Sequence, residues 1–338
     1  MGNFSVNKLK FYLPYYVNWF IKDRIIDTPF FKYLYNKKVK EEIRNLKRKK
    51  FLPQVVYLET TNICNAHCIM CPRDKMTRKI GFMDMNLYKA IVSECADLGI
   101  REIRLHNFGE PLLDTLLYDR IKYAKTKGIP KVLFYTNGSL LNSKAREEII
   151  NAGLDEIFVS IDGSDKIEYE RIRRGLNYEE VVANIKELCK MKRNLRIEKP
   201  IVRLFFTCIF NGKCFSEKRD EIKKFKLKWQ ELVDSILVTK SHDWAGRIKK
   251  GSVCSHIHKW PCMYLWKAMT ILWDGRVSLC CMDFNGENIL GNANKNRLQD
   301  IWNNDLYRKA REAHLNEKSD KISLCRNCSI DRLWSNYD

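Results

Sequence analysis

From residue 53 onward, short apolar runs alternate with stretches of helical period, and this alternation constrains the fold more than any other feature. The runs that read as strands are 55–59, 102–105, 131–135, 156–161, 201–210 and 235–239. The stretches between them that read as helices are 86–98, 113–127, 143–151, 178–192 and 216–229, three of them followed by glycine. Such alternation predicts an α/β fold with a parallel sheet and right-handed crossovers. Six repeats favour an open, partial (β/α)6 TIM-like barrel, with its functional groups at the carboxyl ends of the strands.

The segment before this alternation is basic and aromatic. Residues 1–50 contain 13 Lys and Arg against 4 Asp and Glu, so they carry +9 of the formal net charge of +20. Ten of the 25 residues from 11 to 35 are aromatic, yet no stretch reaches the roughly 20 apolar residues that span a bilayer. Two interpretations fit equally: a helical extension packed on the main domain, or an interfacial helix on the cytoplasmic face of a membrane.

The segment after the alternation has short elements and is rich in Cys, Trp and Asn. We therefore expect three domains: the helical N-terminal extension at 1–50, the α/β core at 51–250, and a small C-terminal domain at 251–338 organised by metal rather than by a large core. The Lys-rich body is read as a solvated surface. A nucleic-acid-binding metalloprotein is the alternative that the +20 charge raises, and no nucleic-acid module supports it.

Thirteen cysteines are too many and too irregularly spaced for a secreted disulfide scaffold. Their odd number excludes complete pairing within one chain, and the first ten residues lack the apolar region of a secretory signal. The expected setting is therefore the cytoplasm, where thiolates serve as metal ligands.

A first set of cysteines, Cys64, Cys68 and Cys71, follows the first predicted strand and so falls at the expected active-site edge. Three thiolates do not complete a tetrahedral zinc site, and His67 is poorly placed between two of them. In a [4Fe–4S] cluster, three cysteines leave one iron open to another ligand. This spacing therefore indicates a cluster that binds a substrate or cofactor.

This spacing after a first strand resembles the radical S-adenosylmethionine (SAM) superfamily. The segment from Asn107 to Pro111, with Gly109 and Glu110, looks like the family's Gly-Gly-Glu-Pro motif, which holds the SAM amino group; Phe108 replaces the first glycine. The resemblance implies that the open iron binds SAM and that SAM cleavage yields a 5′-deoxyadenosyl radical, which abstracts a hydrogen atom from the substrate.

The same resemblance extends to two further strand ends and to a residue of the cysteine segment. Asn137 lies in a Thr-Asn-Gly turn after the third strand, and Ser160 ends the fourth strand, near the SAM carboxylate or ribose in relatives. Met70 stands at a position that is usually aromatic and lies beside the adenine, where the contact is largely through backbone. By resemblance, these residues contribute to SAM binding.

A second set comprises Cys262, Cys280, Cys325 and Cys328. By spacing alone it fits either a zinc site or a closed [4Fe–4S] cluster. The surrounding sequence resembles the SPASM/twitch domains of radical SAM proteins, which implies one auxiliary cluster and two [4Fe–4S] clusters in all. Cys281 competes with Cys280 as a ligand, and the family's glycine-x4-cysteine spacing from Gly275 selects Cys280.

A closed auxiliary cluster suits electron transfer, which favours an oxidation (dehydrogenation) or rearrangement of a sugar, cyclitol or lipid-linked small molecule. A peptide-modifying maturase or epimerase is the alternative. An external flavodoxin- or ferredoxin-type electron donor is also expected. The candidate catalytic residues are Arg203, Cys208 (as a hydrogen-atom donor), His242 and His106, and the candidate substrate contacts are Arg104 and Thr136. Residues 242–246 are expected to close over the pocket.

Overall fold

The computed structural model describes residues 52–209, 215–248 and 261–328, together with Tyr33, Lys37, Lys40 and Glu41. The chain divides into two compact units, Met1–Phe51 and Leu52–Asp338. Most of the N-terminal extension lies outside the described residues, so its expected membrane contact stays a prediction, as do the domain boundaries at 50 and 250. Within the described part of the chain, no helix is long and apolar enough to cross a membrane.

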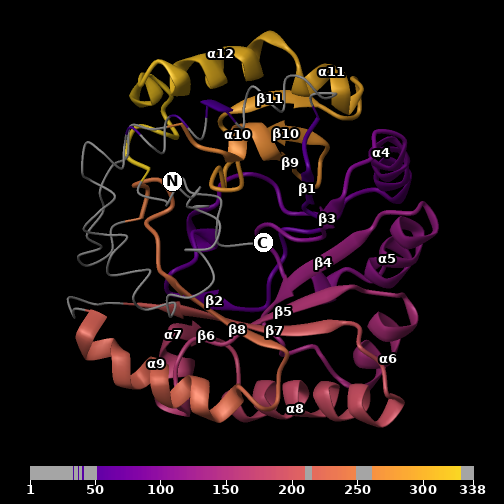
Figure 1. Cartoon of the computed structure of the whole chain (residues 1–338), viewed down its shortest axis with the longest axis vertical. Helices are drawn as coiled ribbons and strands as arrows, with labels where there is room; N and C mark the ends of the chain where they lie inside the picture. Colours follow the sequence, from indigo (N-terminus) through magenta and orange to yellow (C-terminus); the bar gives the residue numbers. More distant parts are fainter. Residues whose placement is uncertain are drawn as a thin grey trace, which may run out of the picture. The chain divides into compact units, whose positions relative to one another are not determined.

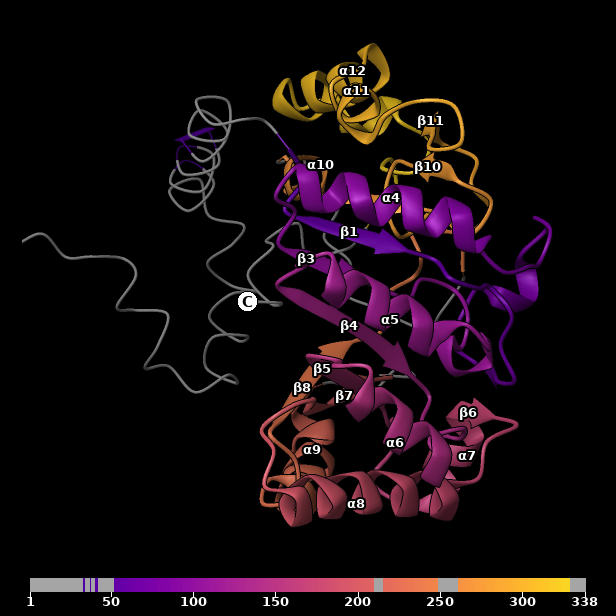
Figure 2. The same ribbon diagram turned by 90° about the vertical axis from the view of Figure 1, so that its right-hand side faces the viewer.

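A curved sheet with a parallel core forms the second unit (Figure 1). Its six predicted strands run parallel in the order in which they follow along the chain: β1 (Val55–Leu58), β3 (Glu102–Arg104), β4 (Lys131–Thr136), β5 (Glu156–Ser160), β7 (Ile201–Cys208) and β8 (Ser235–Lys240). The helices α4 (Met85–Asp97), α5 (Leu117–Thr126), α6 (Ser143–Asn151), α8 (Tyr178–Leu195) and α9 (Phe215–Trp229) cover its outer face (Figure 2). The predicted α/β fold with a partial (β/α)6 barrel is confirmed.

Alternation along each strand decides which side chains reach the interior of the barrel. In β7, Val202, Leu204 and Phe206 are buried, and the Phe206 ring lies 4.5 Å from Phe225 of α9. Their neighbours Arg203, Phe205 and Thr207 are half-buried and turn to the opposite, inner face. We call this side of the strands, away from the helices, the inner face.

The C-terminal segment extends the same sheet. β9 (Ala268–Ile271) pairs in parallel with β1, and β10 (Arg276–Ser278) and β11 (Ile289–Asn292) continue antiparallel, which makes nine strands. The short helix α10 (Tyr264–Lys267) precedes β9, and α11 (Leu298–Trp302) and α12 (Asp305–Leu315) follow β11.

This segment, expected to be organised by metal rather than by a large core, also contains a small packed core of its own. Trp266, Trp302 and Tyr307 are fully buried, and the Arg311 guanidinium lies 4.4 Å from the Trp302 ring centroid. Burying three large aromatic rings removes several hundred Å² of apolar surface from water. Packing therefore supports this segment in addition to any metal it binds.

Several local elements were not predicted from the sequence. The helix expected at 113–127 begins only at Leu117, because the Glu110 carboxylate first caps a short 3-10 turn, Pro111–Leu113. A short helix, α7 (Lys166–Ile172), follows β5. Two dipeptides, β2 (His67–Cys68) and β6 (Arg173–Arg174), form an antiparallel pair. No local sequence pattern predicts this pairing, because Cys68 and Arg173 are 105 residues apart.

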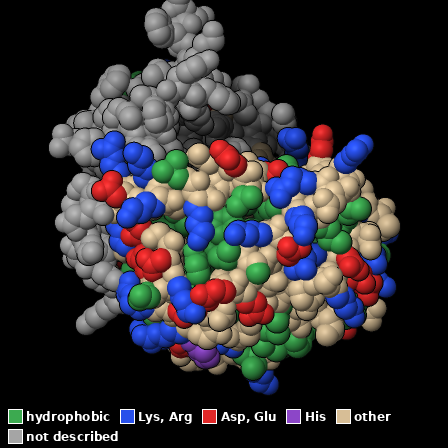
Figure 3. Space-filling view, turned by 90° about the horizontal axis from the view of Figure 1, so that it is seen from below, with side chains coloured by type: hydrophobic (Ala, Val, Ile, Leu, Met, Phe, Trp, Pro, Cys, Tyr) green, Lys and Arg blue, Asp and Glu red, His purple; other side chains and the backbone are tan. Residues whose placement is uncertain are grey.

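The outer surface around α8 carries charges of both signs (Figure 3). Exposed residues of α8 include Glu179, Lys186, Glu187, Lys190 and Arg193. Lys190 and Glu187 form an ion pair at 3.8 Å. On this face, Lys and Arg are interspersed with Asp and Glu, as in a solvated surface.

Asp155 joins three strands at their amino ends. Its carboxylate accepts hydrogen bonds from Val132 N at 2.8 Å, Lys125 Nζ at 2.6 Å and Lys199 Nζ at 2.5 Å. Its carbonyl accepts from Ile201 N at 2.9 Å. Burial alone would raise the pKa of Asp155, but the hydrogen bonds from the two lysines lower the pKa overall.

We expect Asp155→Asn to lower the free energy of unfolding by about 1–3 kcal/mol at neutral pH, because charge-assisted hydrogen bonds are lost. Since the folded-state pKa is depressed, this contribution is complete above the ordinary carboxyl pKa of about 3.9 and fades as pH falls below it. Anaerobic urea unfolding of the holoprotein measures the difference. Asp97→Asn, at an exposed position at the end of α4, is the control, and an equal loss in both variants would contradict the assignment.

Candidate active site

The three cysteines of the first set lie together in the loop that follows β1, with Cys68 in β2. Burial, with a smaller contribution from nearby Cys68, raises the pKa of the Cys64 thiol to about 11. Burial raises the pKa of Cys71 to about 12, with added contributions from Cys68 and Cys64. These mutual effects place the three thiols within electrostatic reach of one another, as a shared cluster requires.

His67 is turned away from these thiols. Its imidazole is 62% exposed, and Nδ1 lies 2.9 Å from the Asp74 carboxylate. This placement agrees with the expectation that His67 is not a fourth ligand.

The Glu110 side chain ties the ends of β3 and β4 together. Its carboxylate accepts from Asn137 N and Thr136 Oγ1, both at 2.7 Å, and from Leu112 N at 3.1 Å. Its own backbone N–H donates to Ile63 O at 2.8 Å in the cysteine loop. Glu110 and Thr136 are buried, so they hold the loops in place. The expected contact of Glu110 with SAM stays a prediction.

A glycine is required at position 109 for steric reasons. A Cβ there would clash with Thr61 O and would lie 2.9 Å from Ile63 O. The backbone of this motif therefore lies directly against the backbone of the cysteine loop. Phe108, where relatives have a glycine, is buried and packs 5.2 Å from the Trp244 ring.

The turn after β4 is joined to the cysteine loop by side chains. Asn137 Nδ2 donates to Asn65 Oδ1 at 2.8 Å, and Asn65 Nδ2 donates to Ser139 Oγ at 2.9 Å. Ser160, at the end of β5, is half-buried. The loops carrying Cys64, Gly109 and Asn137 thus meet at one edge of the sheet, as predicted for the carboxyl ends of parallel strands.

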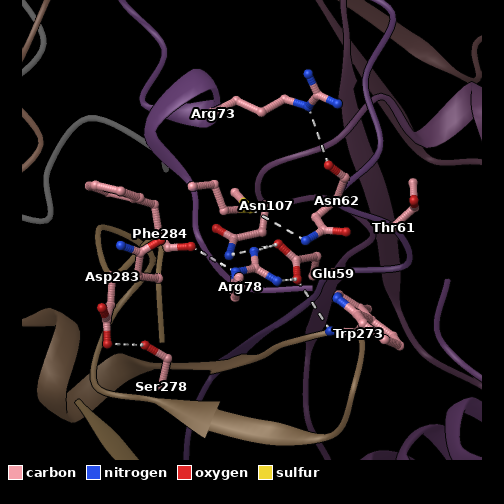
Figure 4. A network of polar contacts seen from close by, with 12 residues as sticks. Glu59, Thr61, Asn62, Arg73, Arg78, Asn107, Trp273, Ser278, Asp283 and Phe284 are labelled. Carbon is pink, nitrogen blue, oxygen red and sulfur yellow. Dashed lines mark hydrogen bonds and ion pairs between the residues drawn. The ribbon is translucent and has the colours of Figure 1, made fainter. Parts of the chain in front are cut away.

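A buried ion pair connects this edge with the C-terminal hairpin (Figure 4). Arg78 donates to both oxygens of Glu59, at 2.7 and 2.5 Å, and both side chains are almost completely buried. Arg78 Nε also donates to Phe284 O at 2.7 Å, and Trp273 N donates to Glu59 at 3.3 Å. Asn107 Nδ2 reaches Glu59 at 3.5 Å. One charge pair therefore joins β1, the cysteine loop, the end of β3 and the turn after β9.

A second connection is the segment 241–248, which follows β8 and which we call the strap. Trp244 Nε1 donates to Met70 O at 2.6 Å, between two of the first cysteines. A Cβ on Gly246 would lie 2.6 Å from Cβ of Asn327, between Cys325 and Cys328. Arg247 pairs with Glu287 at 2.9 Å, near the second cysteine set. The strap thus contacts residues that neighbour both cysteine sets, and the expected closure of residues 242–246 over the pocket stays a prediction.

The four thiols of the second set lie near one another, and Cys281 lies beside them. Burial raises the pKa of Cys280 well above its ordinary value, with further contributions from Cys281, Cys325 and Cys328. Cys281 is influenced in the same way by Cys262. Cys262, Cys280 and Cys281 all pack on Val55, Tyr57, Tyr264 and Ala268. The choice between Cys280 and Cys281 stays a prediction, and the proximity of Cys280 to the Cys325–Cys328 pair favours Cys280.

An aromatic row crosses the inner face of the barrel. The Tyr135 ring stacks on Phe158 at 4.2 Å and lies 4.4 Å from His106 and 5.3 Å from Phe205. Tyr57 lies 5.7 Å from His106 on the other side. Burial, helped by the nearby Arg104 charge, lowers the pKa of His106 well below its ordinary value.

A charged row lies beyond it, at the amino ends of the strands. Lys131 pairs with Glu102 at 3.4 Å and with Glu156 at 3.1 Å, and Arg203 pairs with Glu156 at 3.1 Å. Arg104 pairs with Glu102 and donates to Tyr57 Oη at 2.7 Å. Arg203, a candidate catalytic residue, and Arg104, a candidate substrate contact, thus neutralise the carboxylates of Glu156 and Glu102, which begin β5 and β3.

The remaining candidates lie apart from this row. Cys208 is buried with the helix-facing residues of β7, near Lys218 and Glu221 of α9, and burial raises its pKa to about 12. That position does not favour the hydrogen-donor hypothesis. His242 is in the strap, 4.3 Å from the Trp244 ring.

The donor sets fit the iron–sulfur clusters that the motifs imply. Each set brings thiols together in a partly buried position, and thiolates are the ligands of such clusters. Among the described residues, no group of three or more His, Cys, Asp or Glu side chains is arranged to chelate a single metal ion. At Gly109 the backbone lies against the backbone of Thr61 and Ile63, so main-chain groups lie beside the first set.

Several residues of this site escaped sequence reasoning. Glu59 carried a signal, since a glutamate continuing a buried strand needs a partner. Arg78 and Arg173 carried none that a single sequence reveals, because Glu59 lies 19 residues from Arg78 and Cys68 lies 105 residues from Arg173.

We expect Arg78→Met to destabilise the protein by about 3–5 kcal/mol, because it leaves Glu59 buried without its cation. The double variant Glu59→Gln, Arg78→Met removes both charges and should recover part of that loss. Anaerobic unfolding and iron content measure both effects. Arg101→Met, at an exposed position, is the control, and a double variant no more stable than the single one would contradict the pairing.

Two family models match the chain. The model described as the radical SAM superfamily matches residues 58–198, and SPASM, an iron–sulfur cluster-binding domain, matches residues 262–329. The S-adenosyl-L-methionine-dependent 2-deoxy-scyllo-inosamine dehydrogenase of Niallia circulans is 24% identical over 279 residues, which cover 81% of this chain and 92% of that protein. The probable GTP 3′,8-cyclase of Methanococcus maripaludis is 34% identical over 131 residues, 38% of this chain and 43% of that protein. The match thus spans less than half of the cyclase.

Solved structures show the same fold. BtrN in complex with AdoMet and 2-DOIA has a TM-score of 0.58 at 19% identity, covering 82% of this chain and 94% of that one. Streptococcus suis SuiB bound to its precursor peptide SuiA has a TM-score of 0.64 at 15% identity, covering 81% and 71%. With both family models placed on the two cysteine sets, the chain is a radical SAM enzyme with a C-terminal SPASM-type domain, and its cofactors are SAM and two iron–sulfur clusters.

Proposed function

We propose that this radical SAM enzyme dehydrogenates a sugar, cyclitol or lipid-linked small molecule bound on the inner face of the barrel. The similarity to a SAM-dependent dehydrogenase of an aminocyclitol over 92% of that protein's length supports this reaction class. The observation that carries the proposal is the buried, unpartnered Nδ1 of His106. Among the described residues, its Nδ1 is a buried atom with no hydrogen-bond partner, placed between two tyrosine rings.

An unpartnered buried nitrogen has lost its hydrogen bonds to water without a replacement, which costs about 1–3 kcal/mol. A substrate hydroxyl at this position would supply the missing partner. Because its pKa is lowered, the imidazole is neutral at physiological pH and can accept the hydroxyl proton as the alcohol becomes a carbonyl. The stacked Tyr135 and Phe158 rings offer a flat apolar surface beside it.

The remaining residues have supporting roles in this proposal. Cys64, Cys68 and Cys71 would hold the SAM-binding cluster, and Cys262, Cys280, Cys325 and Cys328 the auxiliary one. When bound, these groups supply a 5′-deoxyadenosyl radical for hydrogen abstraction and an acceptor for the second electron. Main-chain groups near Met70, Gly109, Asn137 and Ser160 would orient SAM, with Glu110 holding their loops.

The charged row would close the barrel beneath the substrate, so Arg104 and Arg203 would act through the shape and charge of its floor. An external flavodoxin- or ferredoxin-type protein would supply the first electron. Residues 1–50 would bring the enzyme to a lipid-linked or anionic substrate.

Peptide modification is the rival proposal, because SuiB, solved with a precursor peptide, shares the fold. At 15% identity that likeness concerns the fold alone. The two proposals differ in product. Dehydrogenation of a cyclitol or sugar gives a product two hydrogens lighter, whereas a maturase leaves those substrates unchanged and alters a peptide.

Anaerobically reconstituted enzyme is expected to hold about eight irons per chain, four for each cluster, and to release 5′-deoxyadenosine from SAM under reducing conditions. Cys68→Ala should abolish this release, because the first cluster loses a ligand. Cys189→Ala removes a buried thiol of α8 outside both sets and should retain it. Zinc at the second site, or unchanged SAM cleavage in Cys68→Ala, would contradict the assignment.

We expect His106→Ala to lower kcat of substrate oxidation by about 10²–10⁴-fold, the usual contribution of a general base. SAM affinity should change little. Because the pKa of His106 is well below 6.5, kcat/KM of the unmodified enzyme should stay level as pH falls from 8 to about 6. His67→Ala, which removes an exposed imidazole, is the control. A loss of activity centred near pH 6.5 to 7 that disappears in His106→Ala would show an ordinary imidazole pKa instead.

A further inference from the structure

Arg173 lies directly across from one of the first-set cysteines. In the small β2–β6 sheet, Cys68 pairs with Arg173 and His67 pairs with Arg174. Just beyond this sheet, Ile69 N donates to Ile172 O at 2.9 Å. The backbone therefore holds the Arg173 side chain beside the Cys68 thiol, although the two residues are 105 positions apart.

A single carboxylate sets the orientation of the Arg173 guanidinium. Nε and Nη2 both donate to Asp162 Oδ2, at 2.9 and 2.6 Å. Asp162 is itself held, since its Oδ1 accepts from Thr207 N at 2.6 Å. With two nitrogens directed at Asp162, the third, Nη1, points to Cys68 and lies 3.8 Å from its Sγ.

This arrangement is shielded from water. Arg173 is 7% exposed and Asp162 is completely buried. Charges in such a place interact more strongly than at the surface, because solvent screens them less. The adjacent Arg174 is exposed, so its charge is screened although it belongs to the same strand.

We propose that Arg173 tunes the SAM-binding cluster by donating a charged hydrogen bond to the sulfur of Cys68, with Asp162 setting the strength of that effect. The inference rests on Cys64, Cys68 and Cys71 being the ligands of this cluster. Reduction adds one electron to the [4Fe–4S] cluster and breaks no bond. The added negative charge is stabilised by a nearby cation and an N–H···S contact, so Arg173 raises the reduction potential.

A redox titration of the reconstituted, full-length protein without SAM or substrate tests this proposal. The SAM-binding cluster is identified as the one whose reduced EPR signal shifts when SAM is added to a parallel sample. Arg173→Met should lower the equilibrium constant for its reduction about tenfold, which is about 59 mV for one electron. Asp162→Asn should change the constant in the opposite direction, because it leaves the Arg173 charge uncompensated.

Arg174→Met, a neighbouring but exposed position, is the matched control and should leave the potential unchanged. If Arg173 and Asp162 had a merely structural role, Arg173→Met and Asp162→Asn would both lose the cluster, but they would not shift the reduction potential in opposite directions. If Arg173→Met does not retain its cluster, Arg173→Lys and Asp162→Asn decide. Lys keeps the charge but has a single nitrogen, so it cannot donate to Asp162 through two nitrogens and to Cys68 through a third. The reduction potential of Arg173→Lys is therefore expected to lie below that of the unmodified protein.

Potentials unchanged in Arg173→Lys and Asp162→Asn, or shifted in the same direction in Arg173→Met and Asp162→Asn, would overturn the proposal. Because neither SAM nor substrate is present in the titration, its outcome is independent of whether the enzyme dehydrogenates a cyclitol.

Discussion

The Glu59–Arg78 ion pair is the interaction on which the rest of the site depends. Glu59 follows β1, and Arg78 comes from the loop that carries the first three cysteines. Through Trp273 N and Phe284 O, the same pair holds the C-terminal hairpin. Two buried charges are tolerated only when they meet with good geometry and their other donors and acceptors are filled. These conditions place the cysteine loop and the SPASM-type segment against the same strand.

The inner face of the barrel is layered along the strand direction. Charged side chains such as Lys131 and Glu156 meet at the amino ends, and aromatic rings such as Tyr135 and Phe158 occupy the middle. The cysteine loop and the Gly109 backbone lie at the carboxyl ends. Tyr135 and Phe158 are register partners, and Arg203, which is the partner of Phe158, reaches back to Glu156 at the start of β5. A substrate on the inner face would therefore lie between a neutralised floor and the cofactor edge.

Sequence reasoning was most accurate where the physical cause is local. Helix α6 was predicted at its observed bounds, because capping by Asn142 and the apolar period lie within the segment itself. The convergence of Gly109 and Asn137 was also predicted, since parallel strands share their carboxyl edge. The pairing of β9 with β1 was not predicted, because nothing in the sequence of a four-residue strand beyond residue 260 indicates which strand it pairs with.

Side-chain roles showed the same division. The Cys64–Cys68–Cys71 spacing indicated a cluster with one open iron, and the resemblance of the surrounding motifs implied a radical SAM enzyme with an auxiliary cluster, since ligand type and loop position are properties of short segments. Only the tertiary structure decided that Arg203 neutralises Glu156, that Cys208 turns toward α9, and that Arg173 faces Cys68. A charge or a thiol acquires its role from what lies within a few ångströms of it. In a barrel, those neighbours come from strands and loops that are far apart in the chain.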